Sequence, residues 1–197
     1  MTEPVRPAPD PIGDVVPGQP PVPITVWQLP APSPAATLSL PLAQRLVANY
    51  THRHDLVLDL TIGPQLARAT MSAHRRTHQL HPDHLDARED RWEPAALAVA
   101  PWPADERPPQ WLSTCAAWLA PGGCLVLVLA TGEVTIHPRL VTAARTAGLT
   151  YLQHIIAAHQ LRTGGTRLTI DGRHLRVHSD IVVLARPRLT DLEVASG

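Results

Sequence analysis

Several features that define whole classes of protein are missing from this sequence of 197 residues. Its two cysteines are too few for a disulfide framework, and both fall in segments that we expect to be buried. Seventeen basic residues balance seventeen acidic ones, so no overall field draws the chain to nucleic acid or to an anionic membrane. No apolar run is long enough to cross a bilayer, and no basic segment followed by an apolar one opens the chain. We therefore expect a cytoplasmic protein that does not span a membrane.

Several catalytic arrangements are also missing. There is no serine, histidine and carboxylate arrangement, no phosphate-binding glycine loop, and no cysteine in a reactive setting. Eleven histidines raise the question of a metal site, because His78, His81 and His84 recur at three-residue spacing. Pro82 interrupts any helix there, and no cysteine joins the three. We therefore expect a solvated histidine-rich loop and no metal.

Proline dominates the first part of the chain. Runs such as 20–23 and 30–34 remove backbone donors and fix φ, so residues 1–36 are predicted to be a disordered tail whose removal leaves folding intact. The apolar segment 26–29 leaves two alternatives open, since it either docks on the domain or floats free. We expect the folded domain at 37–190 and a short C-terminal tail at 191–197.

Between the tails, the pattern alternates between strands and helices. The apolar run 124–129 is the plainest strand, and its lack of alternation predicts cover on both faces. Asp171-Gly172 predicts a hairpin turn near the end of the domain. The pattern predicts an α/β fold with a Rossmann-like doubly wound sheet and an antiparallel edge hairpin. The expected strands are 55–60, 77–80, 95–100, 124–129, 151–159 and 181–185, and the expected helices are 42–50, 66–75, 109–120 and 138–147.

The order of three stretches along the chain carries a family resemblance. Val57-Leu58-Asp59 precedes a turn, Ala100-Pro101-Trp102-Pro103 follows a later strand, and residues 118–126 lead from a helix into the apolar strand. In this order the chain resembles the class I S-adenosylmethionine-dependent methyltransferases, most closely those that methylate amino groups of DNA. The resemblance covers about residues 41–187 and implies S-adenosylmethionine as the cofactor.

The resemblance implies a set of cofactor-binding residues. Asp59, Thr61 and Gly63 stand where the family has its glycine loop, which lets the backbone approach the methionine part of the cofactor. The second glycine of that loop is missing here. Gln79 stands where the family has a carboxylate for the ribose hydroxyls, and an amide still accepts one hydrogen bond. From the residues alone, Asp59 is either a ligand residue or a helix N-cap, and Gly63 is either a ligand residue or a turn glycine.

The resemblance also implies a catalytic loop at Ala100-Pro101-Trp102-Pro103. In the family, a polar side chain opens this loop and accepts protons from the target amine, and an aromatic ring stacks on the base. Pro101 and Trp102 are the matching positions, but Ala100 has nothing to accept with. Trp102 either stacks on a substrate or packs against the sheet, and the tryptophan-rich neighbourhood favours packing.

These departures leave two hypotheses. The first is a degenerate methyltransferase-like domain with weak or no catalysis, which serves as a binding or regulatory module with a DNA or protein partner. The second is an active methyltransferase for DNA or another amine substrate. Arg68, Arg75 and Arg76 could contact phosphates, although arginines at a helix end more often complement the helix dipole. Three eroded positions, at the glycine loop, at Gln79 and at Ala100, favour the first hypothesis.

Overall fold

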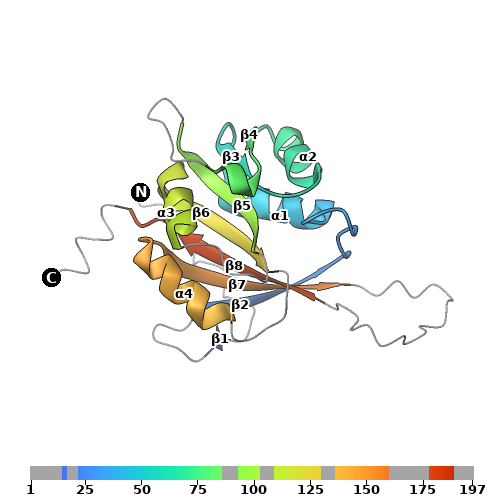
Figure 1. Cartoon of the computed structure of the whole chain (residues 1–197). Helices are drawn as coiled ribbons and strands as arrows, with labels where there is room; N and C mark the ends of the chain where they lie inside the picture. The colour runs from blue at the N-terminus through green and yellow to red at the C-terminus, as the bar shows by residue number, and fades with distance from the viewer. Residues whose placement is uncertain are drawn as a thin grey trace, which may run out of the picture.

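The described part of the computed structural model comprises residues 15–16, 22–85, 93–102, 109–129, 136–159 and 178–188. One sheet with the strand order β1-β2-β7-β8-β6-β5-β3-β4 organises these residues. Helices α1 and α2 pack on one face of the sheet and α3 and α4 on the other (Figure 1). The strands are β1 (Val15–Val16), β2 (Val22–Leu29), β3 (Leu56–Asp59), β4 (Arg76–Gln79), β5 (Ala95–Trp102), β6 (Leu119–Leu129), β7 (Thr150–His159) and β8 (His178–Ala185). The helices are α1 (Leu40–Tyr50), α2 (Gln65–Ser72), the 3-10 turn η1 (Pro82–His84), α3 (Pro109–Trp118) and α4 (Ile136–Thr146).

This is the predicted Rossmann-like doubly wound α/β fold. Strands β3, β4, β5 and β6 run parallel, and β8 is antiparallel to both β6 and β7. The antiparallel pair lies inside the sheet, because β2 pairs in parallel with the outer side of β7. The hairpin turn expected at Asp171-Gly172 lies outside the described residues. No helix in the described segments is long and apolar enough to cross a membrane.

The central strands bury both faces, as their continuous apolar sequence predicts. In β6, Val126 faces the core beneath α1 and α2, and Leu127 faces the core beneath α3 and α4. Both side chains have 0% exposure, so the expectation of cover on both faces is confirmed. Cys115 and Cys124 are free thiols, and both are buried as expected.

The expectation of a disordered tail over residues 1–36 is wrong for Val22–Leu29, which form strand β2. Ile24 to Leu29 pair with His154 to His159 of β7 in parallel register. The proline runs 20–23 and 30–34 that suggested a tail flank this segment, and a missing donor is tolerated at the start of a strand. Of the two alternatives for the segment 26–29, docking on the domain is therefore the one observed.

Side chains anchor β2 as well as backbone pairing. Gln153 donates to the Thr25 hydroxyl at 2.6 Å, and the Tyr50 hydroxyl donates to Gln153 Oε1 at 2.6 Å. Burial raises the pKa of Tyr50, which keeps its hydroxyl protonated as a donor. The Arg45 guanidinium lies 5.6 Å from the Trp27 ring centroid, within the range of a cation–π contact. Helix α1 and strands β2 and β7 are thus tied into one unit.

Candidate functional site

The carboxyl ends of three neighbouring strands bring the predicted ligand residues together. Asp59 of β3 stands opposite Gln79 of β4 and Val99 of β5 in the parallel register. Leu80 donates its backbone N–H to the Asp59 carbonyl at 3.0 Å, which extends the pairing one residue past the end of β4. Ligands of open α/β sheets bind at this edge, because loops and helix N-termini converge there. Helix α2 separates Asp59 from Gln79 along the chain, and the pairing of β3 with β4 makes the two residues neighbours in the sheet.

Asp59 shapes the turn that leads from β3 into α2. Its Oδ1 accepts hydrogen bonds from the Thr61 backbone N–H at 2.9 Å and from the Thr61 hydroxyl at 2.7 Å. Both side chains are buried. Helix α2 has Pro64 at its N-cap with no capping side chain, so the alternative that Asp59 is a helix N-cap is wrong. Gly63 has a φ of 97°, in the left-handed region that glycine occupies without strain.

The second oxygen of the Asp59 carboxylate accepts no hydrogen bond from the described residues. This atom, Oδ2, is buried. A buried acceptor without a partner costs about 1–3 kcal/mol, and more when it is charged. Among the described residues, the other buried side-chain oxygen without a hydrogen-bond partner is Oε1 of Gln65, the first residue of α2. Sequence reasoning passed over Gln65, although it stands where the family's second loop glycine was missing.

We expect the stability to depend on the protonation of Asp59. Burial raises the pKa of this carboxyl, against the opposing effect of the Thr61 hydrogen bonds. The native state therefore holds the proton more tightly than the unfolded chain, and stability is lost as the pH rises from about 4 through the raised native pKa. Asp59→Asn lacks this titration. Urea denaturation at pH 4 and pH 7 should show the wild type losing stability relative to Asp59→Asn at the higher pH, and a difference independent of pH would contradict it.

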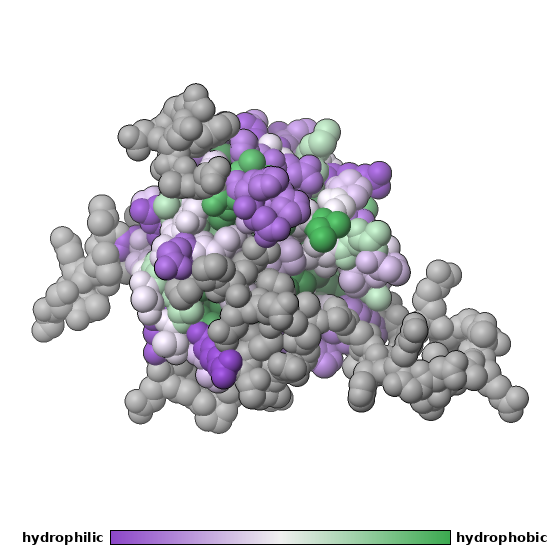
Figure 2. All heavy atoms as spheres, in the orientation of Figure 1, coloured by the Kyte–Doolittle hydropathy of each residue, from purple (hydrophilic) through white to green (hydrophobic). Residues whose placement is uncertain are grey.

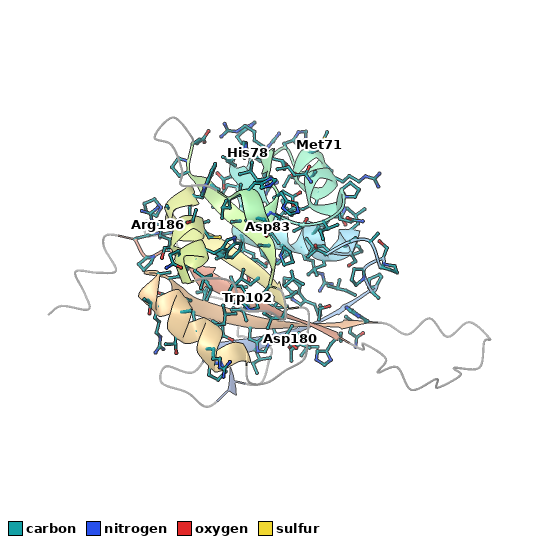
Figure 3. All side chains as sticks on the ribbon, viewed as in Figure 1. Met71, His78, Asp83, Trp102, Asp180 and Arg186 are labelled. Carbon is teal, nitrogen blue, oxygen red and sulfur yellow. The ribbon has the colours of Figure 1, made fainter. Side chains whose placement is uncertain are left out.

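The predicted catalytic loop begins inside the core. The Trp102 side chain, labelled in Figure 3, is 5% exposed. It meets the Trp111 ring edge-on, with 6.1 Å between ring centroids. The Trp111 indole donates to the Pro82 carbonyl at 3.0 Å, which fixes that ring. The packing alternative for Trp102 is thus the arrangement observed. Ala100 is fully buried and Pro101 is half-buried, while residue 103 lies outside the described residues.

Two of the three arginines offered for phosphate contact, Arg75 and Arg76, already have protein partners. Arg75 donates to the hydroxyl and the carbonyl of Thr51 and to the Ala73 carbonyl. Arg76 forms a two-pronged ion pair with Glu93, which raises the arginine pKa and lowers that of Glu93. Hydrophilic side chains predominate over the surface near β4 and α2 in Figure 2, with apolar residues in separate small patches. These contacts favour the structural interpretation of Arg75 and Arg76.

The histidines in β4 and after it also serve local structure. His78 stacks on Trp118 with 5.6 Å between ring centroids. His81 Nδ1 accepts from the Asp83 backbone N–H at 3.3 Å, and its ring lies 5.3 Å from that of His84. Within the described ranges, no group of three or more histidines, cysteines or carboxylates is arranged to hold a metal ion. The three histidines, although regularly spaced in the sequence, therefore do not form one set of metal ligands in the described structure.

A polar cluster that sequence reasoning did not single out lies on β7 and β8. Asp180 accepts from His154 at 3.1 Å, and its other oxygen lies 3.4 Å from His178 Nε2. The side chains of His154 and Asp180 are about nine-tenths buried, whereas His178 is 43% exposed. Asp180 precedes Ile181, which pairs with Val128 near the carboxyl end of β6, so the cluster lies toward the same edge of the sheet. The only sequence signal was a polar residue beside an apolar strand.

Comparison with known proteins gives structural neighbours alone. No protein-family model and no curated protein matches the sequence. The chain is similar to one in the Haloferax volcanii complex between the Trm112 methyltransferase activator and a methyltransferase, with 16% identity over 74% of this chain and 89% of that chain, and a TM-score of 0.49. A Thermoplasma acidophilum structure named as a methyltransferase shares 14% identity over 83% of this chain and 67% of its own, with a TM-score of 0.46.

A third neighbour is a geranyl diphosphate methyltransferase in complex with GPP and sinefungin. It shares 10% identity over 73% of this chain and 77% of its own, with a TM-score of 0.46. These three neighbours are described as methyltransferases. At such identities and TM-scores the likeness adds nothing to the argument, and the fold rests on the strand order and register given above.

Proposed function

We propose that this domain binds S-adenosylmethionine weakly at the carboxyl ends of β3 and β4, and that it acts as a binding or regulatory module that does not methylate exocyclic amines. The observation that carries the proposal is the unsatisfied Asp59 Oδ2, which is buried at the edge where such folds bind ligands. An acceptor in this state calls for a ligand with N–H donors. The α-ammonium group of S-adenosylmethionine supplies three.

Gln79 supports the same placement. Its exposed side chain belongs to the last residue of β4, directly opposite Asp59 in the register. The amide offers one acceptor and two donors, so it can bond a ribose hydroxyl. It lacks the negative charge that would make such a bond strong, which is one reason for expecting weak binding.

The exclusion of amine methylation rests on Ala100. When bound, S-adenosylmethionine supplies an activated methyl group, but an attacking amine must also be oriented and must lose a proton. Ala100 stands where the related loop has its acceptor, and its methyl side chain is fully buried. Trp102, packed against Trp111, presents no open ring face for stacking on a base.

For the partner of such a module, we favour a protein over DNA. Two of the three arginines that the sequence offered for phosphates, Arg75 and Arg76, donate to Thr51, Ala73 and Glu93. The balanced charge of the chain adds no general attraction for nucleic acid. Titration with a DNA duplex at low salt tests this choice, and salt-dependent binding tighter than micromolar would overturn it.

Isothermal titration of the full chain with S-adenosylmethionine tests the proposed function. We expect saturable binding with a dissociation constant on the order of 10–1000 µM. Binding should be weak because the site lacks the second loop glycine and the carboxylate for the ribose hydroxyls. Radiolabelled methyl transfer to DNA or to free adenine should be absent. Failure to bind the cofactor would leave the domain as a scaffold, and methyl transfer to DNA would refute the proposal directly.

Restoring the acid at the end of β4 should strengthen the site. In Gln79→Glu, a charge-assisted hydrogen bond to the ribose replaces a neutral one, which is worth about 1–2 kcal/mol. We expect the dissociation constant for S-adenosylmethionine to fall by about 5-fold to 30-fold, as measured by calorimetry. Methyl transfer should stay absent, because Ala100 is unchanged. Gln28→Glu, an equally exposed change near the end of β2, is the matched control and should leave binding as it was.

A further inference from the structure

The open face of Gly63 is covered by the chain itself. A Cβ built on Gly63 would lie 2.4 Å from Gln65 Oε1 and 3.2 Å from the Ala36 Cβ. Glycine in a ligand-binding turn keeps space for the close approach of a ligand. Here the space beside the Gly63 Cα holds the end of the Gln65 side chain, with Ala36 next to it.

The two covering residues differ in how firmly they are held. Ala36 belongs to a segment fastened to the turn, because Thr37 donates its backbone N–H to the Ile62 carbonyl at 3.0 Å and accepts from the Ile62 N–H at its hydroxyl at 2.9 Å. Gln65 Oε1 is buried and unbonded among the described residues. Moving the Gln65 side chain breaks no bond at this oxygen and returns the oxygen to water. Gln65 is therefore the displaceable part of the cover.

The cover lies beside the turn that leads from Asp59, at the end of β3, into α2. Asp59, with its unsatisfied oxygen, precedes the turn, and Gln79 stands at the end of the neighbouring strand. The nucleoside end of a ligand at Gln79 does not need the space beside Gly63. An amino-acid tail that reaches for Asp59 along the glycine turn does need it.

We propose that Gln65 determines which ligand this site takes, and that the native site holds an adenine nucleoside thioether without an amino-acid tail as well as it holds one with the tail. This inference rests on the proposed function. The tail gains a bond between its ammonium group and Asp59, but it must displace Gln65 and confine a flexible chain, so its contribution to affinity is cancelled. Without the Gln65 side chain, the ammonium group meets Asp59 at no such cost.

Two ligands that lack the sulfonium charge isolate the contribution of the tail. S-adenosylhomocysteine and 5′-methylthioadenosine share the adenosine and the thioether sulfur, and they differ in the amino-acid tail. Calorimetric titration of the full chain should give dissociation constants within about 3-fold of each other. In Gln65→Ala the ratio should shift by about 10-fold or more toward S-adenosylhomocysteine, the worth of a hydrogen bond to a charged group. The affinity for 5′-methylthioadenosine should stay within about 2-fold of the wild type.

Gln65→Met is the matched control, because it keeps the length of the side chain and removes the amide. It should retain the wild-type ratio, since the cover acts by occupying space. Side-chain amide NMR adds a readout that does not depend on affinity: the Gln65 NH₂ resonances should shift when S-adenosylhomocysteine binds and stay unchanged with 5′-methylthioadenosine.

The outcomes separate the two proposals. If 5′-methylthioadenosine binds and Gln65→Ala leaves the ratio unchanged, Gln65 is not the determinant and this inference is wrong, while the proposed function stands. A wild-type preference of about 100-fold or more for S-adenosylhomocysteine would overturn the inference in the same way. If no adenosine compound binds any form of the protein, the proposed function fails, and the inference fails with it.

Discussion

Val126→Asp and Leu127→Asp should each prevent soluble folding. The two side chains lie on opposite faces of β6, and each has 0% exposure in its own half of the core. A carboxylate there lacks both water and a partner, and its cost of about 5 kcal/mol or more is comparable with the entire stability of a domain. Expression followed by circular dichroism and thermal melting of the soluble fraction measures the effect.

Val26→Asp is the matched control for these two substitutions. Val26 lies in β2 and its side chain is 56% exposed, so the same carboxylate stays in contact with water. It should fold with a melting temperature within a few degrees of the wild type, on the order of the effect of a surface substitution. A soluble Val126→Asp or Leu127→Asp protein that unfolds cooperatively would show that β6 is not the central strand.

Removing the first 34 residues should destabilise the domain, contrary to the expectation drawn from its proline content. The deletion takes away β2, with the buried Leu29, the half-buried Trp27 and the hydrogen bond between Thr25 and Gln153. It also exposes the outer side of β7. We expect a loss on the order of 3–5 kcal/mol, or a fall in melting temperature on the order of 10 °C.

A shorter truncation serves as the control for this deletion. Removing residues 1–12 keeps β1 and β2 and every contact described for them. Its melting temperature should lie closer to that of the full chain than to that of the longer truncation. Equal melting temperatures for the full chain and the protein that lacks 34 residues would show that β2 contributes nothing to the stability.

Local pattern predicted most of the elements correctly. Strands β3, β4, β5, β7 and β8 and the four α-helices lie within a few residues of the positions that periodicity, proline and glycine indicated. Strand β6 begins earlier than expected, at Leu119, because Ala95 of β5 pairs with it ahead of the apolar run. β2 was missed because a proline-rich neighbourhood outweighed the short apolar segment, and only the free side of β7 gave that segment a partner.

Some features of the candidate site could likewise be predicted from the sequence, and others could not. The turn at Gly63, the amide at position 79 and the missing acceptor at Ala100 could all be predicted from residue types. The unsatisfied oxygen of Asp59, the burial of Trp102 against Trp111 and the position of Gln65 could not. Each depends on side chains that meet only after packing.

The sequence by itself determined the alternation of strands and helices and the burial of residues 124–129 of β6, because periodicity and continuous apolar runs are local properties that one window of residues contains. The tertiary structure alone decided the order of the strands, the pairing of Asp59 with Gln79, and the covering of Gly63 by Gln65 and Ala36. These contacts join residues whose approach is set by sheet register and by the fit of side chains in a close-packed interior. No local pattern in the sequence encodes that fit.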